Sequence, residues 1–302
     1  MPETSIVTPT YNRAQLIPRL MESVFQQTYQ DFEIIIVDDG STDETEQAVA
    51  EYVKNDPNRV RYVRQSNQGS GAARNTGVDH ARGKYVAFLD SDDVWRPEYL
   101  ERTVGALKMG RYHWAVTGAE RIDIDADGKE TGRSIIRCDL QQKRDYFGRE
   151  LSVFEGLLTG NVLGETSRVV VTKLALQVVG GFRPDLKLSQ DYELWLRLAR
   201  ENYFLCIIED PLVTYQKSVD SVTKTRFIEG LKFGYRIINQ YCREAVQRDP
   251  LFAKFYADKM WIYARDVYHS RPFDPLFLIR CMINSYRFRW MYKLRKKEHE
   301  KS

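Results

Sequence analysis

The chain has 302 residues, of which 43% are hydrophobic and 29% are charged, and its formal net charge is +3. These values predict a soluble globular protein, and no apolar run approaches the roughly 18 residues that cross a bilayer. The four cysteines, Cys138, Cys206, Cys242 and Cys281, lie far apart without a Cys-x-x-Cys motif. This spacing argues against a zinc site or a disulfide framework. Together with a start that lacks a signal-peptide pattern, it predicts a cytoplasmic location.

Charge is distributed unevenly along the chain. Residues 221–302 hold 18 Lys and Arg against 8 Asp and Glu, whereas residues 1–220 hold 27 against 34. The two parts therefore face different partners or each other. We expect a first domain over residues 1–220 and a basic helical extension over residues 221–302.

The first hundred residues alternate between two kinds of pattern. Short β-branched or aromatic runs predict strands at 5–8, 33–37, 60–63 and 84–89, and the segments between them predict helices at 14–27, 43–52 and 69–80. Repeated strand–helix–strand units imply a parallel sheet with helices on both faces.

Beyond residue 114 the pattern is less regular. Further strands are predicted at 168–171, 204–208 and 212–215, and a helix at 192–200. From about residue 221 the pattern is helical to the end, with breaks near Pro250 and Pro272.

Acidic residues follow the fourth predicted strand at once. The run 85–89 ends at Asp90, Asp92 and Asp93, three carboxylates within four residues. Such a cluster becomes favourable when a cation lies among its oxygens, and the carboxyl ends of strands are where open α/β sheets bind ligands. The segment therefore indicates a metal–nucleotide site, with a solvated acidic turn as the alternative.

A second acidic pair, Asp38 and Asp39, follows the strand at 33–37. Neighbouring strands would bring both acid groups into one crevice, where one group accepts from a nucleobase and ribose and the other holds Mg²⁺ or Mn²⁺. None of the four histidines lies near the cluster in the sequence, so a diphosphate would complete the metal shell. The alternative for this pair is an ordinary strand-to-helix turn with a helix cap.

A glycine-rich stretch at 68–77 resembles a dinucleotide fingerprint only superficially. Its third glycine is Gly77 rather than residue 74, and it follows the third strand rather than the first. This argues against a nicotinamide-dependent oxidoreductase. The glycines instead suit a loop that approaches a nucleotide, and Arg74 lies one turn into the helix that follows this loop. The alternative for Arg74 is an arginine at the surface or at the edge of the core, without a role in binding.

Five motifs in order carry a family resemblance: residues 8–13, 37–43, 67–77, 88–93, and 181–182 followed by 190–197. With them the chain resembles the family 2 glycosyltransferases of GT-A fold from residue 5 to about residue 223. The resemblance implies an α/β fold with a Rossmann-like mixed, mainly parallel central sheet flanked by helices. A C-terminal helical extension would follow.

The resemblance also assigns roles. Pro9, Tyr11, Asp39 and Arg74 would line the nucleobase pocket, and Asp90 and Asp92 would contact the rest of the nucleotide. Asp92 and Asp93 would divide metal binding and ribose contact in an order that the sequence leaves open. Asp191 matches the family's catalytic base, against the alternative of a helix N-cap, and Glu193 and Trp195 would contact the acceptor or be structural.

These roles imply an inverting, metal-dependent glycosyltransferase that uses Mn²⁺ or Mg²⁺. It would move a sugar from a nucleotide-sugar, with a UDP-sugar favoured, to a hydroxyl of a glycan or lipid-linked acceptor. The leaving diphosphate needs a cation, and the incoming hydroxyl needs one carboxylate base on the opposite face of the sugar. The alternative is a non-catalytic nucleotide-sugar-binding or scaffold protein of the same fold.

One motif departs from the family. Many relatives carry an arginine and a histidine shortly after the tyrosine that matches Tyr215, whereas this chain continues with Gln216, Lys217 and Ser218. A histidine metal ligand is therefore not expected, and Lys217 is a candidate phosphate contact.

The C-terminal segment 287–297 interleaves six cations with aromatic and apolar residues. This pattern favours peripheral contact of residues 286–297 with an anionic membrane. A solvated helix packed on the acidic first domain, or a subunit contact, are the alternatives. Nothing else in the chain indicates a nucleic-acid module, and the oligomeric state is left open.

Overall fold

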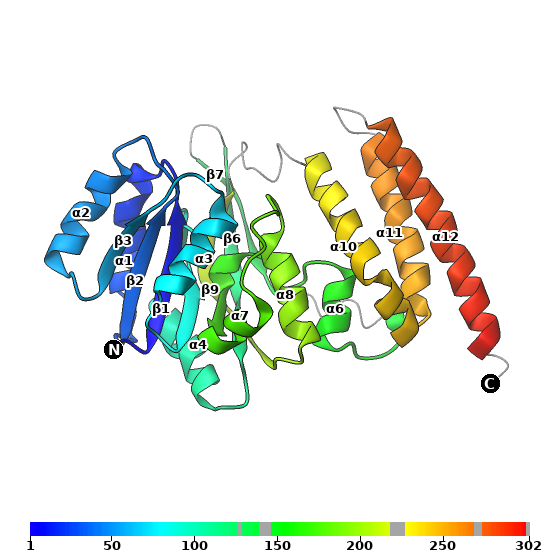
Figure 1. Ribbon diagram of the computed structural model, residues 1–302, viewed down its shortest axis with the longest axis horizontal. Helices are drawn as coiled ribbons and strands as arrows, with labels where there is room; N and C mark the ends of the chain where they lie inside the picture. Colours follow the sequence, from blue (N-terminus) through cyan, green and yellow to red (C-terminus); the bar gives the residue numbers. More distant parts are fainter. Residues whose placement is uncertain (126–128, 139–145, 218–226, 269–273, 300–302) are drawn as a thin grey trace. The chain divides into compact units, whose positions relative to one another are not determined.

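The computed structural model describes residues 1–125, 129–138, 146–217, 227–268 and 274–299 (Figure 1). The chain forms two compact units, one of Met1–Asp139 with Asn161–Val219 and one of Leu140–Gly160 with Asp220–Ser302. The expected division at residue 220 stays a prediction, and residues 146–160 group with the second unit rather than the first.

The described part of the first unit contains one mixed sheet. Its parallel half is β3 (Val60–Arg64), β2 (Phe32–Asp38), β1 (Thr4–Thr10) and β4 (Tyr85–Phe88) in that spatial order. The sheet continues through β8 (Val169–Thr172), β6 (Trp114–Ile124), β9 (Leu205–Lys217) and β5 (Asp93–Trp95), and β7 (Glu130–Ile136) pairs with β6. The predicted α/β class is confirmed, with helices on both faces of the sheet.

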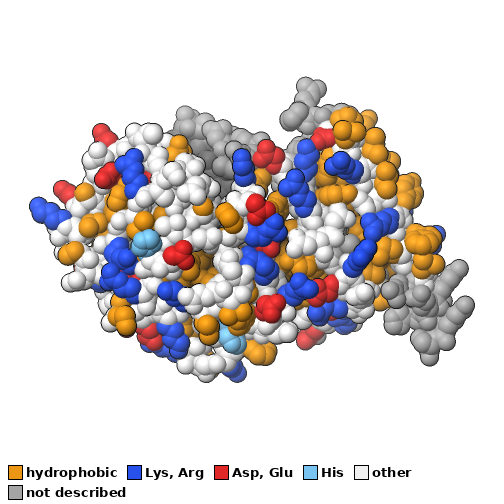
Figure 2. All heavy atoms as spheres, viewed as in Figure 1, with side chains coloured by type: hydrophobic (Ala, Val, Ile, Leu, Met, Phe, Trp, Pro, Cys, Tyr) orange, Lys and Arg blue, Asp and Glu red, His pale blue; other side chains and the backbone are white. Residues whose placement is uncertain are grey.

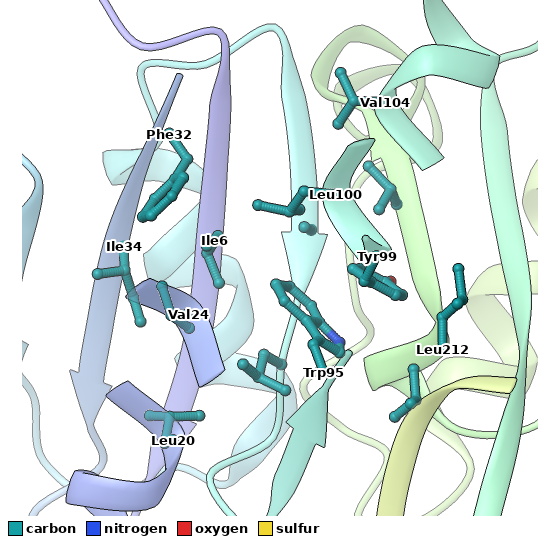
Figure 3. Packing of buried hydrophobic residues seen from close by; sticks show 14 of the residues in the cluster. Ile6, Leu20, Val24, Phe32, Ile34, Trp95, Tyr99, Leu100, Val104 and Leu212 are labelled. Atoms are coloured by element: carbon teal, nitrogen blue, oxygen red, sulfur yellow. The ribbon is translucent and has the colours of Figure 1, made fainter. Parts of the chain in front are cut away.

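One face of the sheet packs on α1 (Ile17–Phe25), α2 (Thr45–Asn55) and α4 (Tyr99–Lys108). Alternate strand residues such as Ile6, Ile34 and Ile36 point into this layer because successive side chains of a strand face opposite sides. Trp95 stacks on Tyr99 at 4.1 Å between ring centroids in the middle of the same cluster (Figure 3).

The other face carries α3 (Ser70–His80), α7 (Lys173–Val179) and α8 (Gln190–Arg200). Gly77 lies so close to the sheet that a Cβ there would come within 2.3 Å of Val7 Cγ1. The missing side chain therefore lets α3 approach β1. Because of this approach, the start of α3 stands directly over the carboxyl end of the parallel strands.

Two elements differ from the prediction. The acidic segment does not end in a plain turn, because Asp93 begins the short strand β5, which pairs with β9. The two strands expected at 204–208 and 212–215 are one strand, β9, whose register with β6 shifts around Gly118. A Cβ on Gly118 would come within 2.4 Å of Glu209 O, so the glycine allows the bulge that keeps β9 continuous.

The described part of the second unit is helical, and the helices expected after about residue 221 are confirmed. It contains α6 (Val153–Thr159), α10 (Phe227–Arg248), α11 (Leu251–Tyr268) and α12 (Pro275–His299). Arg149 donates to Glu155 at 2.8 Å and to Asp249 at 3.0 Å, which ties the segment before α6 to the end of α10. Among the described residues, no helix has the length and apolarity that crossing a bilayer requires.

Candidate active site

The loops that follow β1 and β2 are tied to each other by polar contacts. The Asn12 backbone N–H donates to Ser41 Oγ at 2.9 Å, and Asn12 Oδ1 accepts from the Thr42 N–H at 2.8 Å. Asp38 Oδ1 accepts from the Ser41 N–H at 2.8 Å, so this acid shapes its own turn. Between the loops Tyr11 is 46% exposed and open to a ligand, whereas Pro9 is buried within β1.

Asp39 anchors the glycine-rich loop. Its carboxylate accepts from Gln65 Nε2 at 2.7 Å and from the backbone N–H groups of Gln68 and Gly69 at 2.9 and 2.7 Å. Asp39 is only 4% exposed. Its expected contact with a nucleobase stays a prediction, and the contacts show that Asp39 also fixes the loop that leads into α3.

Arg74 and Asp90, both expected at a nucleotide site, are in direct contact. Arg74 Nη2 donates to Asp90 Oδ1 at 2.6 Å, and the guanidinium lies 5.4 Å above the centroid of the Phe182 ring. Arg74 is buried, and its Nε has no hydrogen-bond partner among the described residues. A buried donor without a partner is costly.

Asp92 and Asp93 point to different surroundings. The side chain of Asp92 is exposed to solvent. The surrounding protein nevertheless desolvates its carboxyl, and this desolvation, followed by the charge of Asp90, raises the pKa of Asp92. Asp93 is buried and accepts from Ser167 Oγ at 2.5 Å. Burial, followed by the charges of Asp92 and Asp90, raises the pKa of Asp93 well above its ordinary value. Only Asp92 of the two is open to solvent.

Asp191 lies in the first turn of α8. Burial raises the pKa of Asp191 to about 6, while the Tyr192 N–H, which donates to Asp191 Oδ1 at 2.7 Å, acts in the opposite direction. The charge of Arg74 also lowers this pKa, and that of Asp90 raises it. The three groups are therefore within electrostatic range of one another, which brings α3, the acidic segment and α8 to one site.

Two hydrogen bonds, which we call the clasp, join Asn75 of α3 to Phe182 in the segment that leads into α8. Asn75 Nδ2 donates to Phe182 O at 2.7 Å, and the Phe182 N–H donates to Asn75 Oδ1 at 2.8 Å. A Cβ on Gly71 would come within 2.5 Å of Gln190 Oε1, so the start of α3 lies against the Gln190 side chain at the start of α8. The sequence placed Asn75 and Phe182 in motifs but gave them no role, and it did not point to Ser167.

The side chains of Glu193 and Trp195 are buried and contact other parts of the protein. Glu193 is buried and accepts from Arg197 Nη2 at 2.7 Å, and this arginine also donates to the carbonyl oxygen of Gly181 at 2.6 Å. Trp195 is fully buried and packs on Trp114 with ring centroids 5.7 Å apart. Of the two readings that the sequence left open, these contacts favour the structural one. Lys217 ends β9, and its side chain lies outside the described part of the chain.

A divalent cation fits the donor set only in part. Among the described residues, no group of three or more His, Cys, Asp or Glu side chains is placed to hold a metal ion. Asp92 offers an exposed carboxylate beside the half-buried Asp90, and oxygen donors of this kind suit Mg²⁺ or Mn²⁺ with further ligands from a bound diphosphate.

Comparison with known proteins gives a family and a fold. The sequence model of Glycosyl transferase family 2 matches residues 5–161, just over half of the chain. The chain is 29% identical to an uncharacterized glycosyltransferase of Rickettsia felis over 84% of its own length, but it spans only 38% of that relative.

Solved structures of similar fold contain nucleotides. The structure of S. aureus TarS 1-349 in complex with UDP matches with a TM-score of 0.57 and 22% identity, covering 84% of this chain and 70% of TarS. The mannosyltransferase PcManGT from Pyrobaculum calidifontis, in complex with GDP-Man and Mn²⁺, matches with a TM-score of 0.59 and 18% identity, covering 94% and 86%. At these identities the likeness shows a shared fold, and the expected GT-A architecture is confirmed.

Proposed function

The chain belongs to glycosyl transferase family 2, and from this premise we propose that it moves a sugar from a nucleotide-sugar donor to an acceptor hydroxyl. A UDP-sugar is the first candidate donor, and a glycan or lipid-linked alcohol is the candidate acceptor. The observation that carries the proposal is the convergence of Arg74, Asp90 and Asp191 at the carboxyl edge of the sheet, with the pKa of Asp191 raised to about 6.

Asp191 is the proposed catalytic base. A carboxyl with a pKa near 6 is ionised at neutral pH, yet it is a stronger base than an ordinary aspartate. It would take the proton of the acceptor hydroxyl while the acceptor oxygen bonds to the anomeric carbon. The bond from that carbon to the nucleoside diphosphate breaks with its electron pair on the diphosphate. Attack opposite the leaving group inverts the anomeric centre.

Positive charge stabilises the proposed leaving group. Arg74, which contacts Asp90, would supply part of this charge, and Arg13 lies close enough to Asp92 to counteract the rise in the pKa of that carboxyl. Asp92, with Asp90 beside it, would hold Mn²⁺ or Mg²⁺, and such an ion neutralises charge that develops on a diphosphate. Asp93 is the weaker candidate ligand because it is buried and already bonded to Ser167.

The nucleobase would lie against Tyr11, the exposed aromatic side chain between the loops after β1 and β2. Asp39 would orient the adjoining glycine-rich loop and contact the base. That TarS was solved with UDP and PcManGT with GDP-Man supports a nucleotide donor, and the base is the property to be measured first. A cytoplasmic location, where such donors and free thiols such as Cys138 and Cys206 occur together, is part of the same proposal.

A direct test is calorimetric titration of the whole chain with UDP, GDP, CMP and ADP, each with and without Mn²⁺. One nucleoside diphosphate should bind with micromolar affinity in the presence of the metal, and its affinity should fall when EDTA is added. The sugar derivatives of that nucleotide are then followed for slow hydrolysis or for transfer to a simple alkyl glycoside.

The control for this test is the exposed variant Leu174→Ser, which should bind and hydrolyse like the parent chain. Binding without any turnover of any donor would favour a nucleotide-sugar-binding protein of the same fold. Absence of nucleotide binding under all conditions would contradict the proposed function as a whole.

A further inference from the structure

Helix α12 is apolar on two opposite sides. On one side Phe277, Cys281 and Phe288 are buried in the core of the second unit. On the other side a row of large apolar side chains, each between 43% and 70% exposed, runs along the helix: Leu276, Ile279, Ile283, Tyr286, Trp290 and Leu294. We call this row the outer stripe. Its members are three or four residues apart, which keeps them on one side of an α-helix.

Within residues 275–297 of α12, the charged residues beside the outer stripe are all basic. The exposed cations Arg280, Arg287 and Lys293 flank it at helical spacing, and residues 275–297 contain no Asp or Glu. Two acids of the same unit form ion pairs, one with a cation of α12 and one with a cation of α10. Asp258 pairs with Arg289 at 4.0 Å, and Asp274 pairs with Lys232 at 2.5 Å. Figure 2 shows hydrophobic side chains gathered along α12 with Lys and Arg side chains among them.

We propose that the outer stripe of α12 binds the surface of an anionic lipid bilayer. An amphipathic helix with an apolar face and flanking cations lies in the plane of the membrane, with the apolar side chains among the acyl–headgroup boundary. Tyr286 and Trp290 carry the amphipathic rings that favour this depth. The 25-residue helix is about 37 Å long, so the stripe makes an extended contact with the membrane surface.

Charge decides between a membrane and a second copy of this chain. If two outer stripes packed against each other, the cations that flank one stripe (Arg280, Arg287 and Lys293) would be brought near those that flank the other. Like charges at a desolvated contact are unfavourable, whereas an anionic bilayer attracts every one of them. Each cation near such a surface strengthens binding about fivefold, so the three together contribute roughly a hundredfold.

The test uses sedimentation of the whole chain with vesicles, and its readout is independent of sugar transfer. One set of vesicles contains phosphatidylcholine with a third of phosphatidylglycerol, and the other contains phosphatidylcholine alone. The parent chain should partition into the anionic vesicles at least tenfold more strongly than into neutral ones. High salt should reduce this preference, because it screens the cations.

Three variants separate the contributions. Ile283→Glu combined with Trp290→Glu should abolish binding to either vesicle, and the triple change of Arg280, Arg287 and Lys293 to Gln should remove the preference for anionic lipid. Leu174→Glu, an equally exposed apolar residue on α7, is the matched control and should bind like the parent. All the changed side chains are exposed, and circular dichroism confirms that each variant is folded.

Trp290 supplies a second readout. Its fluorescence should shift to shorter wavelength on anionic vesicles, and Trp290→Phe should remove that shift while binding is retained. The proposal is overturned if the parent chain does not bind anionic vesicles, or if the stripe variant binds them as well as Leu174→Glu does. It is also overturned if light scattering shows a dimer that only the stripe variant dissociates, since a second copy then covers the stripe.

Discussion

The carboxyl edge of the sheet and the outer stripe of α12 are built in opposite ways. At the sheet edge, side chains are held by partners far away in the sequence, as Arg74 is by Asp90 and Asn75 by Phe182. Along α12, exposed side chains repeat at helical spacing on a helix whose other side is buried. Changes at the sheet edge should therefore spread to the chemistry, whereas changes on the outer stripe should act locally and leave the fold intact.

We expect the largest effect from a substitution of Asp191, the proposed catalytic base at the sheet edge. Asp191→Asn should lower kcat for transfer by about a thousandfold, within the range of a lost general base, while the Kd for the nucleotide changes less than about threefold. Steady-state transfer assays and calorimetry measure the two quantities. Equal losses of turnover and of nucleotide affinity would instead assign Asp191 to the structure of the site.

The same carboxylate should set the pH dependence. Because burial raises the pKa of Asp191 to about 6, kcat should fall tenfold per pH unit below 6 and level off above it. The effect of Asp191 on folding stability changes with pH in the opposite direction to kcat. The stability that its raised pKa contributes is fully present below the unfolded pKa near 4 and is lost as the pH rises through 6. Asp191→Asn should therefore raise the free energy of unfolding at pH 7, by up to about 3 kcal/mol. A flat profile of kcat between pH 5 and 8 would contradict this role.

Exposure distinguishes the two neighbouring acids. Asp92→Asn should weaken Mn²⁺-dependent nucleotide binding at least tenfold with little change in melting temperature, because Asp92 lies at the surface. Asp93→Asn keeps a partner for Ser167 Oγ and removes a carboxyl whose ionised form is disfavoured by burial, so it should raise stability at neutral pH and change affinity less. Calorimetry with and without EDTA, together with thermal melts, separates the two. The reverse pattern would make Asp93 the metal ligand.

One substitution at the sheet edge and one on the outer stripe allow the two regions to be compared by their effects on unfolding free energy and on kcat. Asn75→Ala removes both bonds to Phe182 and should cost about 2 kcal/mol of unfolding free energy, with a several-fold lower kcat. Ile283→Ser on the outer stripe should change the free energy of unfolding by less than about 0.5 kcal/mol and leave kcat on a water-soluble acceptor unchanged. Urea denaturation provides both values. A large cost for Ile283→Ser would mean that the stripe is packed in solution.

The sequence predicted the elements whose patterns are local. The apolar run at 33–37 is the buried strand β2, and the glycine-rich segment opens α3 as expected. The roles of Glu193 and Trp195 were left open because a position on a helix does not reveal whether a side chain contacts the acceptor or only other parts of the protein. The contacts of Asp39 were not predictable, since its three donors come from residues 65–69, which only the folded chain brings near.

The sequence pattern did not predict an element that is very short, and it did not reveal which side of a helix is buried when two sides are apolar. The strand β5 has three residues, too few for an alternation to be recognised. Its first residue is the buried Asp93, and the residue before it is the exposed Asp92. Helix α12 has apolar residues on two sides, so its periodicity does not say which side is buried. Only the packing of Phe277 and Phe288 in the second unit decides this.

The clasp between Asn75 and Phe182 has a consequence for the order of assembly during synthesis. It joins residues 107 positions apart, and closing so long a loop is slow compared with forming the strands and helices near the N-terminus. A ribosome-bound chain that has emerged only to residue 180 already contains Tyr11, Asp39 and Arg74 but has no Asp191. The residues proposed to bind the donor are thus synthesised before the proposed catalytic base, which joins the site last.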